Sequence, residues 1–375
     1  MNYQTGDVKA LYGYRIFETF RLDPVLLVLL MILSTMGVVV LYSASGSDHD
    51  LILRQGIRLL TAFVLLVVIA NVPLRVLKKI STVIYLLGIA LLLAVMFFGE
   101  VGKGAQRWLD LGFIRFQPSE ILKLAVPLMV AAYLSNCLLP VGWKDLLVSV
   151  TLTMIPVLLI AAQPDLGTAI LVGSAGFFVL FLAGIRWRIM IILGVLFSMM
   201  APVLWQVALH DYQRARILTL LNPEQDPLGS GYHIIQSKIA IGSGGVYGKG
   251  WLNGTQSQLD FIPERSTDFI FSVFSEEFGF FGSVLLICLY VVIIYRSLYI
   301  AAHASDNFGR LLAGALSLTF FVYLFVNIGM VTGMLPVVGV PLPLMSYGGT
   351  SMVTLMMGFG LIMSIRASRQ FWNNS

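Results

Sequence analysis

Charged residues are scarce in this sequence. Asp, Glu, Lys and Arg make up only 11% of its 375 residues, whereas hydrophobic residues make up 58%. The longest polar interval, residues 208–268, is short for a soluble domain. This balance excludes an ordinary soluble protein and predicts a polytopic membrane protein.

Cysteine and clustered basic residues are also rare. The two cysteines, Cys137 and Cys288, both fall in apolar runs, so neither a disulfide nor a zinc site is indicated. The net charge is +5, but no basic stripe carries interleaved aromatic residues, which excludes a nucleic-acid-binding surface. Most Lys and Arg residues instead lie at the ends of apolar runs, where they act as orientation signals in a membrane.

Long apolar runs dominate what is present. Ten of them reach or approach the roughly 20 residues that a helix needs to cross a bilayer. They occupy residues 24–44, 56–73, 80–99, 120–139, 146–164, 166–184, 189–207, 280–300, 311–330 and 347–365. A β-barrel is excluded, because barrel strands alternate polar and apolar residues whereas these runs are apolar throughout. The expected fold is an all-α polytopic membrane protein.

Short loops on one side of these spans carry clustered Lys and Arg residues, and by the positive-inside rule that side is cytoplasmic. We therefore expect a cytoplasmic leader at 1–23 and a single transmembrane domain at 24–365. That domain includes a large extracytoplasmic loop at 208–268, between the seventh and eighth spans. Residues 366–375 are expected to form a cytoplasmic tail.

The extracytoplasmic loop ends in a polar stretch that runs to Glu277. Eight glycines lie between Gly229 and Gly254, and glycine is favoured where the backbone takes positive φ or approaches a ligand closely. Residues 233–241 within it are compatible with a short interfacial helix. The following run, 269–301, has 33 residues and contains two glutamates, so part of it should lie at the interface or line a cavity.

Three acids, Asp260, Glu264 and Asp268, precede this run at intervals of four residues. Acids at the lip of a membrane are costly, which makes them functional candidates. One carboxylate suffices as general base on a sugar hydroxyl. Asp260 and Glu264 are alternatively candidate ligands of a divalent cation such as Mg or Mn. His233 is more readily explained as a polar residue on a surface helix than as a catalytic group.

Lys249 lies in a glycine-rich segment that resembles a phosphate-binding loop only in part. Ser243 stands where a nucleotide P-loop needs glycine, and Gly250 stands where it needs Ser or Thr. The nucleotide reading therefore fails, although glycine backbone and one lysine are suited to hold another pyrophosphate.

Further polar clusters are predicted near the outer face. Glu120 and Lys123 are three residues apart on a helix, which fits either a structural ion pair or contact with substrate. Asp165 follows Pro164 and can cap the next helix or contact substrate. The prolines and glycines of residues 327–351 predict irregular backbone between the ninth and tenth spans.

Six long motifs resemble those of one protein family. They are GAQRWLDLG, RFQPSEILK, QPDLGTA, GYHIIQSKIAIGSGGVYGKG, GTQSQLDFIPERSTDFIFSV and NIGMVTGMLPVVGVPLPLMSYGGTS. In this order and nearly end to end, the sequence is similar to the SEDS family (shape, elongation, division and sporulation), closest to its RodA branch. The resemblance implies a ten-span peptidoglycan glycosyltransferase of the bacterial inner membrane, with its active site facing the periplasm.

What the resemblance implies can be carried over by motif. Such an enzyme polymerises lipid II onto a lipid-linked glycan strand, releases polyprenyl pyrophosphate, and works with a class B penicillin-binding protein, a transpeptidase. The family's indispensable aspartate falls on Asp268, as general base or orienting group. Glu120, Lys123 and Arg115 fall in its cavity motif. Ser266 replaces a histidine that many members have, which argues against an adjacent histidine as obligatory base. Asp260 replaces a common glutamate, which only shortens a carboxylate and leaves a metal or positioning role open.

The expected chemistry needs cations as well as a base. The leaving pyrophosphate develops negative charge, which fixed cations stabilise, and Arg107, Arg115, Lys123 and Lys249 are the candidates. In-line displacement would invert the anomeric centre. Two alternatives from other classes stay open: a lipid II flippase, because a polar cavity among ten spans also suits a transporter, and a non-enzymatic scaffold for the transpeptidase. Elongation rather than division is expected from the overall resemblance.

Overall fold

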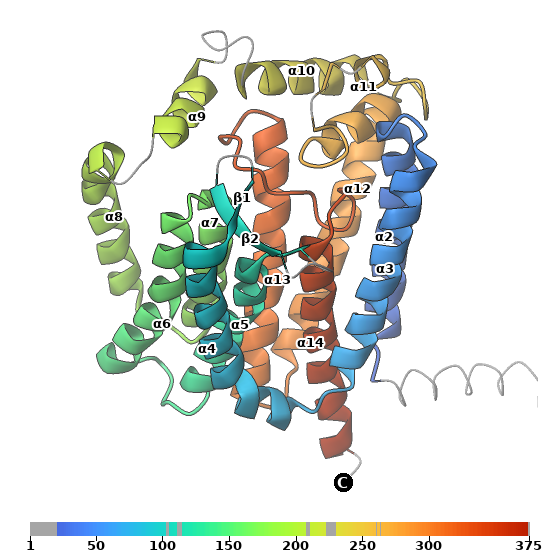
Figure 1. The fold of residues 1–375 in the computed structure, drawn as a ribbon. Coiled ribbons are helices and arrows are strands. Elements are labelled where there is room, and N and C mark those ends of the chain that lie inside the picture. Colours follow the sequence, from blue (N-terminus) through green and yellow to red (C-terminus); the bar gives the residue numbers. More distant parts are fainter. Residues whose placement is uncertain are drawn as a thin grey trace, which may run out of the picture.

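The computed structural model describes residues 21–102, 105–110, 115–207, 211–222, 230–259, 261–262 and 264–373. Most of these residues form a helical bundle (Figure 1). Its helices along the bundle are α2 (Pro24–Ala44), α3 (His49–Ala70), α4 (Leu74–Phe98), α5 (Pro118–Leu134), α6 (Trp143–Ala162), α7 (Leu166–Leu182), α8 (Trp187–Val207), α12 (Ile270–Ala302), α13 (Asn307–Val331) and α14 (Thr350–Asn373).

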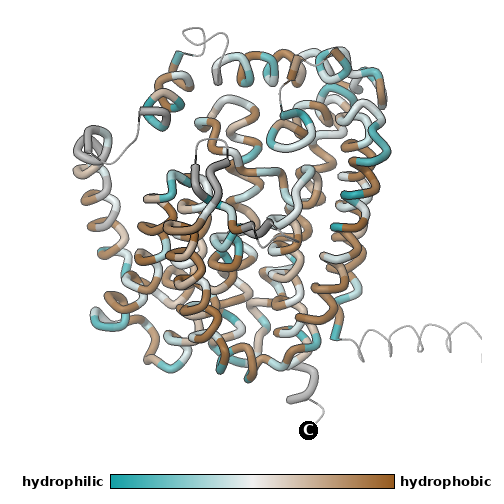
Figure 2. Tube along the Cα trace, in the orientation of Figure 1, coloured by the Kyte–Doolittle hydropathy of each residue, from teal (hydrophilic) through white to brown (hydrophobic). Residues whose placement is uncertain are grey.

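The predicted all-α polytopic membrane fold is confirmed. Within the described residues, seven helices are long and apolar enough to cross a membrane, namely α2, α3, α4, α6, α12, α13 and α14. The other three predicted spans correspond to α5, α7 and α8. Hydrophobic residues run along the bundle and hydrophilic residues gather at its two ends (Figure 2). A helix satisfies its own backbone hydrogen bonds, so apolar runs of this length form helices in lipid.

Helix α13 lies at the centre of the bundle, where it packs against α5, α7, α12 and α14. Small residues allow close packing around it, because a Cβ at Gly314 would lie 2.4 Å from Leu182 Cδ1 of α7. The outer helices instead expose large apolar side chains, such as Leu60 of α3 at 68% and Leu285 of α12 at 66%. Large apolar side chains thus cover the outside of the bundle, and polar side chains lie toward its centre and its ends.

Short elements cover one end of the bundle. Helices α9 (Asp211–Leu221), α10 (Ser230–Ser243) and α11 (Thr255–Gln258) belong to the long loop, and α10 lies across the bundle end (Figure 1). Helix α10 confirms the short helix expected at 233–241. A small antiparallel sheet of β1 (Glu100–Gly102), β2 (Ala105–Asp110) and β3 (Arg115–Phe116) was not anticipated. Its strands are too short to carry a recognisable alternation of polar and apolar residues.

The 33-residue run forms α12, which is kinked at Gly279 with φ 65° and ψ −161°. A Cβ at Gly279 would lie 2.3 Å from the backbone nitrogen of Gly248, so only glycine allows this close approach. Before the kink, Glu276 and Glu277 are buried inside the protein at 0% and 1% exposure. The span expected from residue 280 therefore begins just after the kink. The two glutamates lie before the kink, where protein rather than lipid surrounds them.

The segment 332–349 between α13 and α14 is irregular, as expected. Tyr290 of α12 donates to Pro343 O at 2.6 Å, and Leu342 N donates to Ser346 Oγ at 2.8 Å. Protein groups therefore satisfy its non-helical backbone. Helix α14 extends into the expected tail as far as Asn373. Residues 1–20 of the expected leader lie outside the described part, and the domain limits stay a prediction.

Candidate functional site

Asp268 lies half-buried in a turn, residues 264–269, that leads into α12. The irregular segment between α13 and α14 holds this turn at two backbone oxygens. Tyr347 N donates to Ser266 O at 2.8 Å, and Ser346 Oγ donates to Thr267 O at 2.5 Å. The backbone on the N-terminal side of Asp268 is therefore fixed by residues about eighty positions away in the chain.

Asn327 of α13 fixes the backbone of Asp268 itself. Its Nδ2 donates to Asp268 O at 2.9 Å and to Val340 O at 2.7 Å. Gly339 has φ 75°, and a Cβ there would lie 3.5 Å from Asp268 Oδ2, so its bare backbone faces the carboxylate. Two elements thus set the position of Asp268: the amide of α13 and the glycine of the following segment.

We expect Asn327→Leu to lower both stability and activity. The substitution keeps the side-chain volume close to that of asparagine but removes both donated bonds, leaving two carbonyls short of a donor. Each such loss costs about 1–3 kcal/mol where water does not replace the donor. Thermal unfolding in detergent measures the first effect. Asn71→Leu is the matched control, because that amide donates to Val67 O within its own helix end; equal loss in both variants would contradict the specific role.

The predicted pair of Glu120 and Lys123 is present in the first turns of α5. Lys123 Nζ lies 2.7 Å from Glu120 Oε1, and the two residues are only 5% and 4% exposed. Lys123 Nζ also lies 5.2 Å from the ring centroid of Tyr323 on α13. Such an ammonium over an aromatic face is attracted by the ring as well as by the carboxylate.

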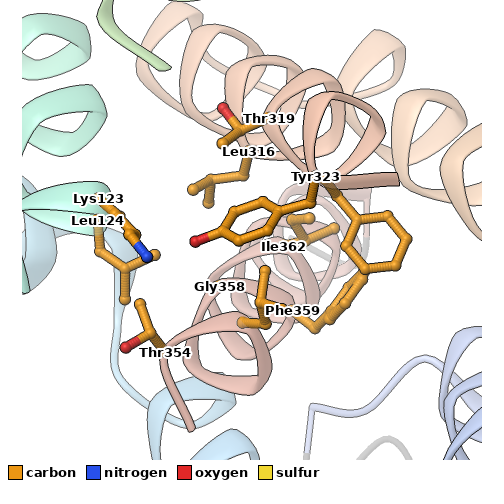
Figure 3. Close-up of a pocket in the computed structure, with 11 residues that line it drawn as sticks. Lys123, Leu124, Leu316, Thr319, Tyr323, Thr354, Gly358, Phe359 and Ile362 are labelled. Carbon is orange, nitrogen blue, oxygen red and sulfur yellow. The ribbon is translucent and has the colours of Figure 1, made fainter. Parts of the chain in front are cut away.

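A pocket with about 380 Å³ of empty space opens beside this pair, between α5, α13 and α14. The ammonium of Lys123 and the hydroxyl of Tyr323 point toward each other within it (Figure 3). Most other lining side chains are apolar, among them Leu124, Leu316 and Phe359, and Thr319 and Thr354 add hydroxyl groups. The pocket is therefore apolar with a small number of placed polar groups, as ligand sites usually are.

One face of α13 connects the pair to Asp268. Tyr323 and Asn327 are four residues apart, so they share a helix face. Within the described residues, Glu120 Oε2 and Asn327 Oδ1 are buried without a hydrogen-bond partner. Buried polar atoms usually have partners, so oxygens left over in this region are available for a polar ligand or for water. The fold thus brings Asp268 and the Glu120–Lys123 pair against one face of α13, which carries Tyr323 and Asn327.

Arg107 and Asp165 form a second cluster. Arg107 Nε of β2 lies 3.8 Å from Asp165 Oδ2, and an Arg107 Nη2–H group donates to Pro164 O. Gln117 Nε2 donates to Asp165 Oδ2 at 2.9 Å, and Asp165 Oδ1 accepts from Thr168 N at the start of α7. Asp165 is therefore the predicted helix cap and also a partner of one predicted cation. The side chain of Arg115 lies outside the described part.

Lys249 has a carboxylate partner of its own. Its Nζ lies 2.8 Å from Oε1 of the buried Glu276, which also accepts from Gln256 N at 2.9 Å and Ser257 N at 3.2 Å. This carboxylate fastens the glycine-rich segment and α11 to the first half of α12. The contact of Lys249 with substrate stays a prediction.

The metal hypothesis gains no support from the described residues. Glu264 has φ 53°, and its Oε2 accepts from Thr267 Oγ1 at 2.9 Å. Asp260 lies outside the described part. Among the residues that the structure does describe, no group of three or more His, Cys, Asp or Glu side chains is placed to hold a metal ion.

Sequence reasoning missed Tyr323 and the role of Asn327. Tyr323 lies inside an apolar run, where an aromatic residue is typical of core packing. The available signal was the four-residue spacing of Tyr323 and Asn327, because two polar tips on one face of a membrane helix indicate a polar environment.

The sequence is similar to known proteins over nearly its whole length. The model of a family described as cell cycle protein, FTSW_RODA_SPOVE, matches residues 23–371. The chain is 53% identical to the peptidoglycan glycosyltransferase MrdB of Escherichia coli (strain K12) over 359 residues, covering 96% of this chain and 97% of that protein. It is 35% identical to the probable peptidoglycan glycosyltransferase FtsW of Geobacter sulfurreducens, covering 94% and 97%.

Two solved structures are similar throughout. One, described as structural coordination of polymerization and crosslinking by a peptidoglycan synthase complex, contains a chain with a TM-score of 0.82 and 33% identity, covering 92% of this chain and 98% of that one. The other is the rod shape determining protein RodA of Thermus thermophilus, with a TM-score of 0.70 and 29% identity, covering 92% and 97%.

Proposed function

The chain belongs to the FtsW, RodA and SpoVE family of cell cycle proteins, and on that premise we propose that it is a peptidoglycan glycosyltransferase. It polymerises lipid II into glycan strands for cell-wall elongation. The observation that carries the proposal is 53% identity, over nearly the whole of both chains, with a protein named for this activity. The fixed position of Asp268 supports the proposal from the side of the chemistry.

In the proposed reaction, Asp268 accepts the proton of the acceptor sugar hydroxyl. The acceptor oxygen then bonds to the anomeric carbon of the donor, the bond from that carbon to the pyrophosphate oxygen breaks, and polyprenyl pyrophosphate leaves. Attack opposite to the leaving group inverts an α-linked donor to a β-linked glycan. Asp268 is suited to this role because its backbone is held from α13, and a fixed base avoids reorganisation during the reaction.

The leaving group requires positive charge on the other side of the anomeric carbon. Lys123, Arg107 and Lys249 are the described candidates, and each lies beside a carboxylate, at 2.7 Å, 3.8 Å and 2.8 Å. In the proposed mechanism these carboxylates hold the cations in place. The pyrophosphate accepts from the N–H groups of the cations that do not bond to the carboxylates. The apolar lining of the pocket beside Lys123 suits a lipid-linked substrate.

The active site is assigned to one side of the membrane, and the enzyme to one partner protein. The site faces the periplasm, because the clustered Lys and Arg residues of the short loops assign the opposite side to the cytoplasm. The partner is a class B penicillin-binding protein, the transpeptidase that cross-links the product. A similar solved chain from a complex that coordinates polymerization and crosslinking supports this pairing.

Labelled lipid II tests the proposal against the flippase alternative. The full chain is reconstituted in liposomes that contain fluorescent lipid II, with and without the transpeptidase. We expect glycan strands, resolved as a ladder by electrophoresis. Transfer of lipid II between leaflets, measured by quenching the outer leaflet, without any strand would favour the flippase. If the chain shows neither activity but still binds the transpeptidase, the scaffold alternative is favoured.

A further inference from the structure

A basic cluster lies at the end of the bundle opposite to the Asp268 turn, where α2 begins and α14 ends (Figure 1). Its centre is Asp23, whose carboxylate is fully buried and caps α2 by accepting from Leu26 N at 2.7 Å. Two guanidinium groups converge on it. Arg296 Nη2 of α12 and Arg366 Nη1 of α14 lie 2.7 Å and 2.6 Å from Asp23 Oδ2.

The charges of this cluster do not balance. Among the residues that the structure describes here, two guanidinium groups share one carboxylate, so one positive charge is left over. Together the arginines carry ten N–H donors, and Asp23 accepts from only a few of them. Both arginine side chains are still accessible, at 24% and 29% exposure. The cluster is therefore equipped to bind an anion in addition to its internal carboxylate.

The two arginines line a pocket with about 260 Å³ of open space, together with Tyr299, Ile300 and His303. Arg296 lies over the Tyr299 ring at 5.4 Å, and His303 Nδ1 donates to Tyr299 O at 2.9 Å. That bond leaves the second ring nitrogen of His303 free of this carbonyl and, once protonated, able to donate to an anion. The planar forks of Arg match the oxygens of a phosphate, which makes phosphate the fitting anion.

An apolar surface leads from this pocket along α12. Val292, Tyr295 and Tyr299 are 46%, 68% and 43% exposed and follow the spacing of one helix face. In a membrane this face meets acyl chains, with Tyr299 at the boundary between lipid and water. Basic pockets between membrane helices on the cytoplasmic side bind anionic headgroups. We propose that Arg296, Arg366 and His303 bind the phosphodiester of an anionic phospholipid, whose acyl chains lie along this face of α12.

The test counts lipid molecules retained by the full chain, using native mass spectrometry from detergent. The probes are phosphatidylglycerol and phosphatidylcholine with identical acyl chains, and inorganic phosphate is a separate arm. We expect retention of one phosphatidylglycerol in preference to phosphatidylcholine. Arg296→Gln and Arg366→Gln should each lower that retention roughly tenfold, the loss typical of one charge-assisted hydrogen bond.

Each of these variants keeps one arginine paired with Asp23, so α2 stays tied to either α12 or α14. Arg310→Gln is the matched control, because Arg310 is an exposed arginine at the start of α13, and it should retain lipid as the unaltered chain does. Asp23→Asn keeps the helix cap but raises the surplus charge, and should increase retention. Equal retention by Arg366→Gln and the unaltered chain overturns the proposal. Displacement of the lipid by an equal concentration of inorganic phosphate overturns its assignment to a phospholipid.

Discussion

Asp268→Asn is expected to slow glycan polymerisation by about 10²–10⁴-fold, the usual contribution of a positioned general base. The amide keeps the shape of the side chain but cannot accept the proton of the acceptor hydroxyl. The contacts of the turn with α13 and with the segment that follows α13 are made by backbone oxygens of residues 266–268, which the substitution leaves in place. Folding and thermal stability should therefore change little. The measurement is the initial rate of strand formation from labelled lipid II.

Asp306→Asn is the control for this experiment. Its carboxylate caps α13 by accepting from Gly309 N at 3.3 Å, and asparagine caps helices equally well. The same chemical change outside the site should leave the rate within a factor of two or so. Should Asp268→Asn polymerise as fast as Asp306→Asn, the base lies elsewhere and the proposed mechanism is wrong.

Breaking the Glu120–Lys123 pair is expected to have the largest effect on stability. Either Glu120→Gln or Lys123→Met alone leaves one charge buried without its partner, which costs about 3–5 kcal/mol. Both residues are nearly inaccessible, so water compensates for little of the loss. The effect is measured by thermal unfolding in detergent, with the fraction of monodisperse protein recorded at each temperature. Lys78→Met is the control, because Lys78 is a partly exposed lysine bonded to Asn136 Oδ1, and its loss should change stability by less than about 1 kcal/mol.

The double variant Glu120→Gln/Lys123→Met separates the two roles of the pair. Replacing a buried ion pair with neutral groups is often neutral for stability, so the double variant should recover most of the stability that each single variant loses. If Lys123 stabilises the leaving pyrophosphate, the stable double variant will still polymerise slowly. A double variant that is both stable and fully active would show that the pair serves only the fold.

The apolar runs were sufficient to predict the helices of the bundle. The physical reason is local, because a backbone in lipid must satisfy its hydrogen bonds within the segment. Length also indicated that residues 269–301 could not form one upright span. It could not locate the kink at Gly279, which depends on contact with Gly248, a residue from a different part of the chain.

The candidate site divides in the same way. The i, i+3 spacing predicted that Glu120 and Lys123 share a helix face, and the pair is present. No spacing relates them to Tyr323, two hundred positions later, or relates Asn327 to Asp268. The helix cap at Asp165 was predicted from its neighbours, whereas its contact with Arg107 depends on a hairpin that carries no clear sequence signal.

The sequence by itself determined that this is a helical membrane protein and which charged residues lie within or beside its spans. Through its motifs it also determined the family to which the protein belongs. Tertiary structure decided which charges meet: Lys249 with Glu276, Lys123 with the Tyr323 ring, and two arginines with Asp23. The physical reason is the range of each effect. Hydropathy and helix spacing act over a few turns, whereas pairing of charges in a bundle depends on helices that are far apart in the chain.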